Sequence, residues 1–174
     1  MRSISIVNRH PRLRVNRRRL LHALHTLDAH FPPSPPRSSR PAGSVVPPGE
    51  LTFVFLTDAA LARLHADFLQ DPSPTDVITF PGDPGLGLAG EVCISVDAAV
   101  RHCQATKVKA GGAAMAKCVS TELTLYVVHG WLHLAGYDDL VPAKKRAMRR
   151  AEVRALALLR AHRALADFDL KPGT

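Results

Sequence analysis

The sequence predicts an α+β protein in which a small mixed β-sheet of about four strands packs with about five helices. Short apolar segments, some of them alternating with polar residues, are interspersed with longer segments that carry leucine and alanine at helical spacing. Two strand segments follow each other closely enough to pair as an antiparallel hairpin, whereas helices separate the others. We interpret residues 1–174 as one domain of ordinary size.

The N-terminal third of the chain is expected to form two strands and one helix. Residues 2–8 alternate with a period of two and predict a strand. Residues 15–31 place leucines at helical spacing, with Asn16 as the N-cap. Residues 32–49 are rich in proline and serine and predict an exposed connection. The nearly continuous apolar run of residues 50–57 favours a strand inside the sheet.

The middle of the chain predicts one helix and the hairpin. Residues 58–69 carry a helical pattern, capped by Thr57 or Asp58. After a turn with two prolines, residues 76–80 form a short strand, and a glycine-rich turn leads to a second strand at residues 90–96. These two strands are the expected antiparallel pair.

Three further helices complete the predicted layout. One opens at Asp97, a mostly apolar one covers residues 119–135, and a long basic one covers residues 141–166. Helices of this kind are expected to cover the sheet and bury its apolar face.

Charge is unevenly distributed along the chain, whose formal net charge is +8. Residues 1–40 hold nine arginines and one aspartate, and residues 141–174 hold nine basic and three acidic side chains. Residues 41–140 hold five basic and eleven acidic side chains. Basic ends around an acidic centre suit a polyanionic partner such as RNA. The alternative is that these charges only solvate two surface helices, and composition does not decide between the two.

Cysteine usage and hydropathy predict a cytoplasmic protein without a membrane partner. Cys93, Cys103 and Cys118 form no C-x-x-C pair, so they suggest neither a disulfide framework nor a zinc ribbon. We interpret them as buried thiols in a reducing compartment. No apolar run approaches the ~18 residues of a membrane span, and the N-terminus lacks the apolar stretch of a signal peptide.

The most informative pattern is VVHGWLHLAGYDDL, residues 127–140. His129 and His133 are four residues apart, so a helix would place both imidazoles on one face, where they can bind one metal ion. Gly136 stands where a helix can end with a positive φ, and the chain can then turn back. Asp139 is placed to supply a third ligand. The spacing predicts a metal site on a helix and the turn after it.

Three protein ligands leave one coordination position open, which is typical of a catalytic zinc rather than a structural one. An aspartate makes the ion a somewhat weaker Lewis acid than a third histidine would, and it is compatible with harder ions such as Mn²⁺. The other interpretation is two histidines on an amphipathic helix with no metal. The glycine and aspartate at suitable offsets favour the metal site.

Three segments of the chain resemble one family. Residues 129–139, HGWLHLAGYDD, are similar to the H-G-x-L-H-L-x-G-Y-D-H signature of the YbeY-type endoribonucleases, the rRNA maturation factors of bacteria. Residues 74–81, PTDVITFP, resemble that family's P-T-D-V-L-S-F segment, and residues 90–95, GEVCIS, resemble its G-D-I-x-I-S strand. Order and spacing agree over about residues 50–140.

The resemblance implies a zinc-dependent, single-strand-specific endoribonuclease that acts in rRNA processing, notably in maturation of the 3′ end of 16S rRNA, and in ribosome quality control. Its expected partners are rRNA and the small ribosomal subunit. Its expected cofactor is one Zn²⁺ ion, with other divalent metals open, and no nucleotide cofactor. His129 and His133 match two histidine ligands of the signature, and Asp139 stands in place of the third. Asp138 matches the signature's aspartate and is expected to orient a ligand.

Other positions near the matched segments are harder to assign. The family usually carries an arginine five residues before the proline of P-T-D-V, where Leu69 stands, so another basic residue substitutes or the activity is altered. Thr75 and Asp76 are interpreted mainly as hydrogen-bonding the turn backbone. Glu91 and Glu122 are candidates for a general base, and the sequence does not choose between them.

Two other functions fit part of the pattern. A zinc metallopeptidase has the same ligand spacing, but it needs a glutamate after the first histidine, where Gly130 stands. A non-catalytic ribosome assembly factor with a structural metal stays open because of Asp139 and Leu69. A structural zinc normally has four protein ligands, so a fourth ligand such as a cysteine would favour that alternative.

Overall fold

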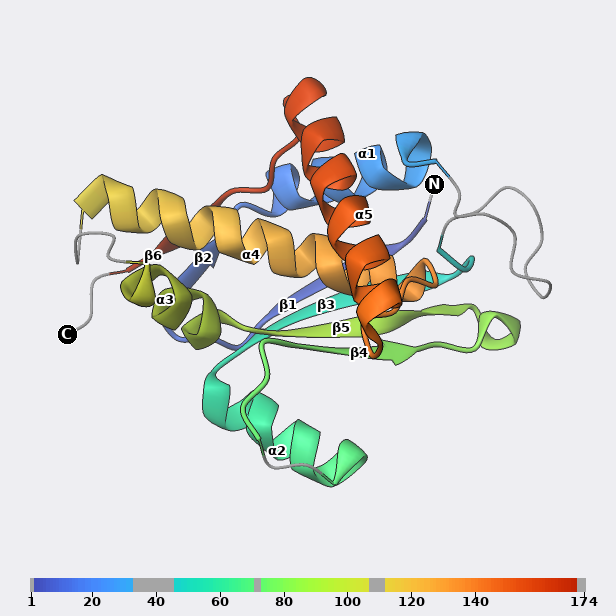
Figure 1. The fold of residues 1–174 in the computed structure, drawn as a ribbon, viewed down its shortest axis with the longest axis horizontal. Coiled ribbons are helices and arrows are strands. Elements are labelled where there is room, and N and C mark those ends of the chain that lie inside the picture. Colours follow the sequence, from blue (N-terminus) through green and yellow to red (C-terminus); the bar gives the residue numbers. More distant parts are fainter. Residues whose placement is uncertain (1, 33–45, 71–72, 107–111, 172–174) are drawn as a thin grey trace.

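A mixed four-stranded sheet forms the centre of the computed structural model, which describes residues 2–32, 46–70, 73–106 and 112–171 (Figure 1). The strand order is β1-β3-β5-β4. The first three are parallel neighbours and β4 pairs antiparallel with β5, which confirms the predicted hairpin. The bounds are β1 Ile4–Asn8, β3 Glu50–Leu56, β4 Val77–Pro81 and β5 Leu88–Ser95.

Five α-helices occur within the described residues, so the predicted α+β class is confirmed. Helices α1, α4 and α5 lie on one face of the sheet, and α2 lies on the other (Figure 1). A short 3-10 helix, η1, connects β4 to β5. The bounds are α1 Arg17–His30, α2 Asp58–Leu69, η1 Pro84–Leu86, α3 Val96–Ala105, α4 Gly112–Leu134 and α5 Pro142–Ala161.

Side-chain caps fix the start of three helices. Asn16, as predicted, accepts a hydrogen bond from the backbone N–H three residues later, at 3.2 Å. Thr57 does the same for α2 at 3.3 Å, which decides between the two predicted caps. Ser95 caps α3 at 3.1 Å, so this helix begins at Val96, one residue before the predicted position. Each cap satisfies a backbone donor that the first helical turn leaves without a partner.

A second sheet was not predicted. Strands β2, Leu13–Val15, and β6, Phe168–Leu170, pair antiparallel. The helix predicted over residues 141–166 therefore ends early, at Ala161. Arg163 adopts a φ of 53°, and the Ala164 N–H donates to the Leu159 carbonyl at 2.8 Å, the pattern of a left-handed helix end. Because an arginine rather than a glycine makes this turn, the sequence did not indicate where the helix ends.

The sheet buries apolar side chains on both faces. On β3, Phe53 and Phe55 belong to the core under α1, α4 and α5, whereas Val54 and Leu56 belong to a smaller cluster on the α2 side. This is why residues 50–57 read as a continuous apolar run, and it confirms the predicted interior position of the strand.

The connection predicted over residues 32–49 falls largely outside the described residues. Among its described residues Pro32 and Pro48 are exposed as expected, but the expectation is wrong for Val46, which is 1% exposed and packs in the core. The Arg2 guanidinium holds the C-terminal end of the connection in place by donating to the carbonyls of Val46 and Pro47 at 3.0 and 2.6 Å.

The cysteine prediction is wrong for two of the three residues. Cys103, on α3, forms a disulfide with Cys118, on α4, while Cys93 is a free, buried cysteine on β5. The sequence separation of 15 residues gives no sign of the pair, because only the packing of α3 beside α4 brings the two together. Burial raises the pKa of the Cys93 thiol to about 12, so that thiol stays protonated. None of the described helices combines the length and hydropathy needed to cross a bilayer.

Helix α4 approaches the sheet most closely at Gly130. A Cβ built on this glycine would lie 2.2 Å from Cγ1 of Val92, a fully buried residue of β5. Two packed carbon atoms normally lie about 3.5–4.0 Å apart, so no larger residue fits here without displacing the strand. The glycine thus fixes the distance between the helix that carries the histidines and the sheet.

We expect Gly130→Ala to lower the free energy of unfolding by about 1–3 kcal/mol, the usual cost of overpacking. In a Val92→Ala background the same substitution should instead be neutral or raise stability by up to about 1 kcal/mol, because alanine has the better helix propensity. Urea denaturation of the four proteins measures both effects. If Gly130→Ala raised the free energy of unfolding equally in both backgrounds, the close contact between Gly130 and Val92 would be contradicted.

Candidate metal site and adjoining cavity

The last two turns of α4 present both histidines on one face. Nε2 of His129 and Nε2 of His133 lie 3.0 Å apart. The helix then ends as predicted, because Gly136 has a φ of 94° and its N–H donates to the His133 carbonyl at 2.9 Å. The Tyr137 N–H donates to the Leu132 carbonyl at 3.0 Å and closes the turn.

This turn brings Asp139 back to the histidines. Its Oδ2 lies 3.9 Å from Nε2 of His129, and its Oδ1 lies 3.8 Å from Nε2 of His133. One potential ligand atom from each residue lies within 4.8 Å of the other two. Zinc at about 2.0–2.2 Å from nitrogen and oxygen ligands, in tetrahedral geometry, separates them by about 3.3–3.5 Å, so small shifts suffice. The donor set fits a divalent ion.

A fourth residue supports this group and was missed by the sequence analysis. Oε1 of Glu152, on α5, lies 2.7 Å from Nδ1 of His129. A carboxylate that accepts from Nδ1 leaves Nε2 free to bind a metal, and it fixes the orientation of the ring. Glu152 is the only acidic residue of α5, and this lone carboxylate in a basic helix was the available signal.

The surroundings of the two histidine rings shift their pKa values in opposite directions. Burial disfavours the protonated form of His129. The hydrogen bond and the charge of Glu152, together with the charge of Asp139, outweigh this burial and raise the pKa of His129 above its ordinary value. Burial and the neighbouring His129 lower the pKa of His133. His133 is therefore the ring that is more readily neutral, which is the form that binds a metal.

Asp138 contacts a different part of the turn. Its Oδ2 accepts from Nζ of Lys144 at 2.6 Å, and its Oδ1 accepts from the Leu140 N–H at 3.0 Å. The Lys144 hydrogen bond holds the pKa of Asp138 below its usual value. Among the described residues, no hydrogen bond joins Asp138 to either histidine, so any orienting effect would act through the turn that carries the next aspartate.

A cavity of about 360 Å³ adjoins the three candidate ligands. Helices α4 and α5 supply most of its walls, and the rest comes from Asp76, just before β4, and from Asp139, in the turn after α4. The cavity combines carboxylates with two cationic side chains from α5, and it has apolar walls. Its lining residues are Asp76, Glu122, Leu125, Tyr126, His129, Asp139, Lys145, Met148, Arg149 and Glu152.

The two candidates for a general base lie on different faces of the sheet. Glu122, on α4, lines the cavity, and burial raises the pKa of its carboxyl. Glu91, on β5, is exposed and accepts from Cys93, which packs in the cluster on the α2 side. Val92, which lies between Glu91 and Cys93 on the strand, faces α4. Because side chains alternate along a strand, Glu91 points to the opposite face, away from the histidines.

The proline turn before β4 lies at the edge of the cavity. Thr75 donates to the Val77 carbonyl at 3.3 Å, and Asp76 accepts from the Val77 N–H at 3.0 Å, in keeping with the predicted backbone role. Asp76 also lines the cavity, which the sequence analysis did not anticipate. Leu69 is the last residue of α2, and its side chain lies outside the described part of the chain.

Comparisons with known proteins agree on one family. Residues 38–160 match the family model described as Endoribonuclease YbeY. The Endoribonuclease YbeY of Chlamydia abortus is 41% identical over 116 residues, which cover 64% of this chain and 70% of that protein. The Chlamydia pneumoniae protein of the same name is 40% identical over 121 residues, 67% of this chain and 73% of that protein.

A solved structure is also similar over nearly its full length. The solution structure of TM1509 from Thermotoga maritima aligns with a TM-score of 0.48 and 16% identity, covering 98% of this chain and 99% of that chain. The segment matched by the family model is the one that contains the candidate ligands and Glu152.

Proposed function

Because the chain belongs to the Endoribonuclease YbeY family, we propose that it is a metal-dependent endoribonuclease that cuts single-stranded RNA during rRNA processing. The observation that carries the proposal is the convergence of His129, His133 and Asp139 beside a cavity with cationic side chains. The proposal extends to the 3′ end of 16S rRNA and ribosome quality control, with the small ribosomal subunit as partner and the cytoplasm as location.

Zn²⁺ is the proposed cofactor, held by these three residues with Glu152 orienting His129. Three ligands and an open position are the arrangement of catalytic rather than structural zinc. When bound, such an ion supplies Lewis-acid activation of a phosphate or a water molecule. The family resemblance and the nitrogen-rich donor set favour zinc over harder ions.

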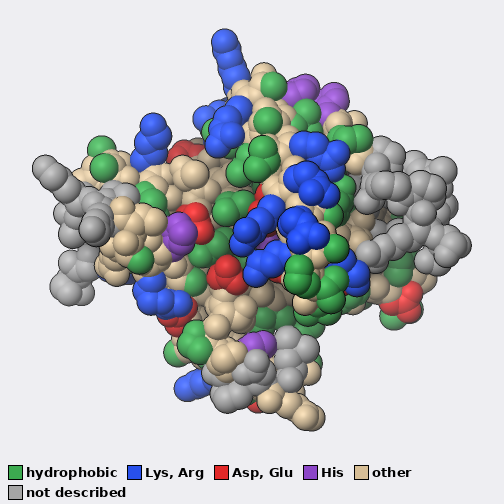
Figure 2. All heavy atoms as spheres, in the orientation of Figure 1, with side chains coloured by type: hydrophobic (Ala, Val, Ile, Leu, Met, Phe, Trp, Pro, Cys, Tyr) green, Lys and Arg blue, Asp and Glu red, His purple; other side chains and the backbone are tan. Residues whose placement is uncertain are grey.

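The residues of the cavity have complementary tasks in this proposal. Lys145 and Arg149 line it from α5 and would bind phosphate oxygens of the RNA. Lys and Arg side chains gather over α5 on the face shown in Figure 2, next to acidic side chains. Glu122 is the proposed general base, because it lines the same cavity and its raised pKa makes its carboxylate a stronger proton acceptor.

The assembly-factor alternative is less well supported. It would be favoured by a fourth protein ligand such as a cysteine. Among the described residues, the metal-competent group contains three members, none of them a cysteine. Cys103 and Cys118 are bonded to each other, and Cys93 packs on the α2 side of the sheet. The peptidase alternative lacks its base, since Gly130 stands between the histidines.

Cleavage of a single-stranded RNA that carries the 3′ end of 16S rRNA tests the proposal. Zinc-loaded protein is expected to cut it, whereas chelated protein and a His133→Ala variant purified identically are not. Equal cutting by all three would show a contaminating nuclease. Absence of cutting by protein with bound zinc would overturn the ribonuclease proposal in favour of an assembly role.

A further inference from the structure

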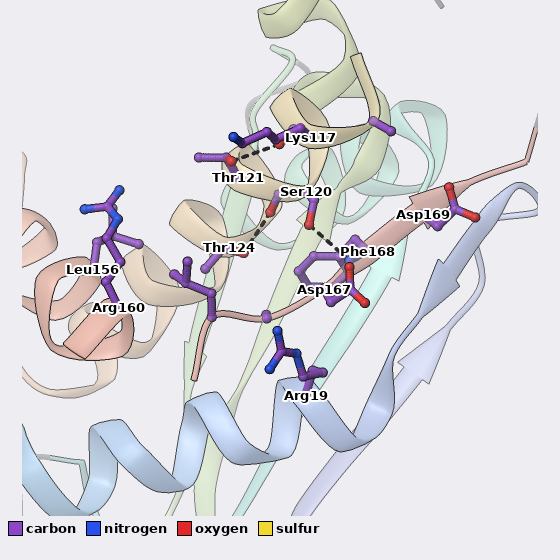
Figure 3. A pocket seen from close by; sticks show the side chains of 13 residues that line it. Arg19, Lys117, Ser120, Thr121, Thr124, Leu156, Arg160, Asp167, Phe168 and Asp169 are labelled. Atoms are coloured by element: carbon purple, nitrogen blue, oxygen red, sulfur yellow. Dashed lines mark hydrogen bonds between the residues drawn. The ribbon is translucent and has the colours of Figure 1, made fainter. Parts of the chain in front are cut away.

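A second and larger hollow lies between α1, α4, α5 and the segment that leads into β6 (Figure 3). Its volume is about 610 Å³, and none of its lining residues lines the cavity beside the candidate metal ligands. We call it the basic groove. Its walls include Arg19, Lys117, Thr121, Leu156, Arg160 and Phe168.

Three cationic side chains surround the basic groove, each from a different helix. Arg19, Lys117 and Arg160 are exposed, and within the described parts of the chain none of them forms an ion pair. An adjoining hollow of about 580 Å³ shares Arg19 and adds Arg18 and Arg163.

Two carboxylates reduce the positive charge of the basic groove without cancelling it. They belong to Asp167 and Asp169, and Asp167 already accepts a hydrogen bond from Asn16 at 3.1 Å. Five cationic side chains against two carboxylates leave an excess of positive charge over both hollows. Such a surface attracts a polyanion.

The wall chemistry of the groove suits a nucleic acid strand. Leu156 and Leu165 are half-buried and give the groove apolar walls, whereas Phe168 is only 4% exposed. Arginine side chains present planar donors that match phosphate oxygens, and apolar walls can contact sugars and bases.

The groove lies within reach of a strand bound at the metal site. Helix α5 supplies Arg149 to the cavity beside the ligands and Arg160 to the basic groove. These two residues are 11 positions apart, about 16 Å along a helix that rises 1.5 Å per residue. At about 3.4 Å or more per nucleotide, about five nucleotides of a single strand, or fewer, span that distance.

We propose that the basic groove binds the phosphate backbone of single-stranded RNA a few nucleotides away from the segment held at the metal site. The choice of RNA as the ligand rests on the proposed function, but the groove itself includes none of the candidate metal ligands. It would raise the affinity for long substrates without taking part in the chemistry.

Equilibrium binding of labelled single-stranded RNA to full-length protein in chelator, where no metal-dependent cutting occurs, tests this site. The double variant Arg19→Ala/Arg160→Ala should bind a 12-mer about tenfold more weakly, and the slope of log K against log salt concentration should fall in magnitude by about 1.4. The matched control Arg9→Ala/Arg63→Ala removes two exposed arginines elsewhere and should bind the 12-mer like wild type.

Arg160→Ala alone protects the test against a folding artefact. Within the described residues the Arg160 side chain makes no hydrogen bond, whereas Arg19 donates to the Arg163 carbonyl at 3.2 Å. The single variant should show a smaller loss in the same direction, with unchanged thermal unfolding.

Three results would overturn the proposal. Equal weakening by both double variants would mean that only overall charge matters. Wild-type affinity of the Arg19→Ala/Arg160→Ala variant for the 12-mer would mean that the groove is not used. Preference for polyglutamate of matched charge over RNA would assign the groove to an acidic protein. Because binding is measured without cutting, this test of the groove can be interpreted even if the protein proves not to be a ribonuclease.

Discussion

Asp139→Ala is expected to abolish zinc binding at micromolar protein and with it RNA cleavage, whereas Asp139→His should keep both. The aspartate is the third of three converging ligands, and two histidines alone hold zinc weakly. The loss should exceed the 10–100-fold that removal of a supporting hydrogen bond typically costs. Competition with a chromogenic chelator measures affinity, and cleavage is followed on the same preparations.

Asp138→Ala is the matched control, since it removes the neighbouring carboxylate, which contacts Lys144 instead of the histidines. Its zinc affinity should stay much closer to that of the wild type. If Asp139→Ala binds zinc as tightly as wild type, the third ligand is another residue and the inference from the turn after α4 is wrong.

Glu152→Gln is expected to weaken zinc binding by about 10–100-fold, the usual effect of losing a carboxylate behind a histidine ligand. The amide keeps the shape of the side chain but loses the charge that favours and orients the His129 ring. Nitrogen NMR of the metal-free variant should also show a mixed population of the two neutral His129 tautomers, where wild type holds the proton on Nδ1.

The effect of Glu152→Gln should depend on pH in a defined direction. Glu152 helps to raise the pKa of His129, so protons compete with zinc at higher pH in the wild type than in the variant. The affinity gap should therefore narrow as pH falls through the raised His129 pKa. Glu122→Gln, the same change in the same cavity without a contact to His129, should leave zinc affinity unchanged. Equal effects of the two variants would contradict the orienting role.

Much of the fold follows from local pattern, and the exceptions have physical causes. The continuous apolar run of β3 identified an interior strand because both faces of the sheet are covered. The sequence did not predict the pairing of β2 with β6, because strands of three residues are too short to show an alternation of apolar and polar side chains. The end of α5 was missed because Arg163 adopts the left-handed conformation that glycine usually signals.

The residues of the candidate site also differ in whether the sequence predicts them. His129, His133 and Asp139 lie within one helix end and turn, so their spacing alone placed them together. Glu152 comes from the next helix, and its position depends on how α5 crosses α4, which no local pattern encodes. The choice between Glu91 and Glu122 required knowing which face of β5 meets α4.

Gly130 limits what the histidine pair can become. A metallopeptidase could in principle arise from this spacing through a single Gly130→Glu substitution, but that carboxylate would start from a Cβ inside the volume of Val92. The substitution would disrupt the packing of α4 on β5 before it could supply a base. Evolution toward peptide hydrolysis would need compensating changes in the strand first, so the close helix–sheet contact acts as a barrier between two hydrolytic chemistries that share a ligand pattern.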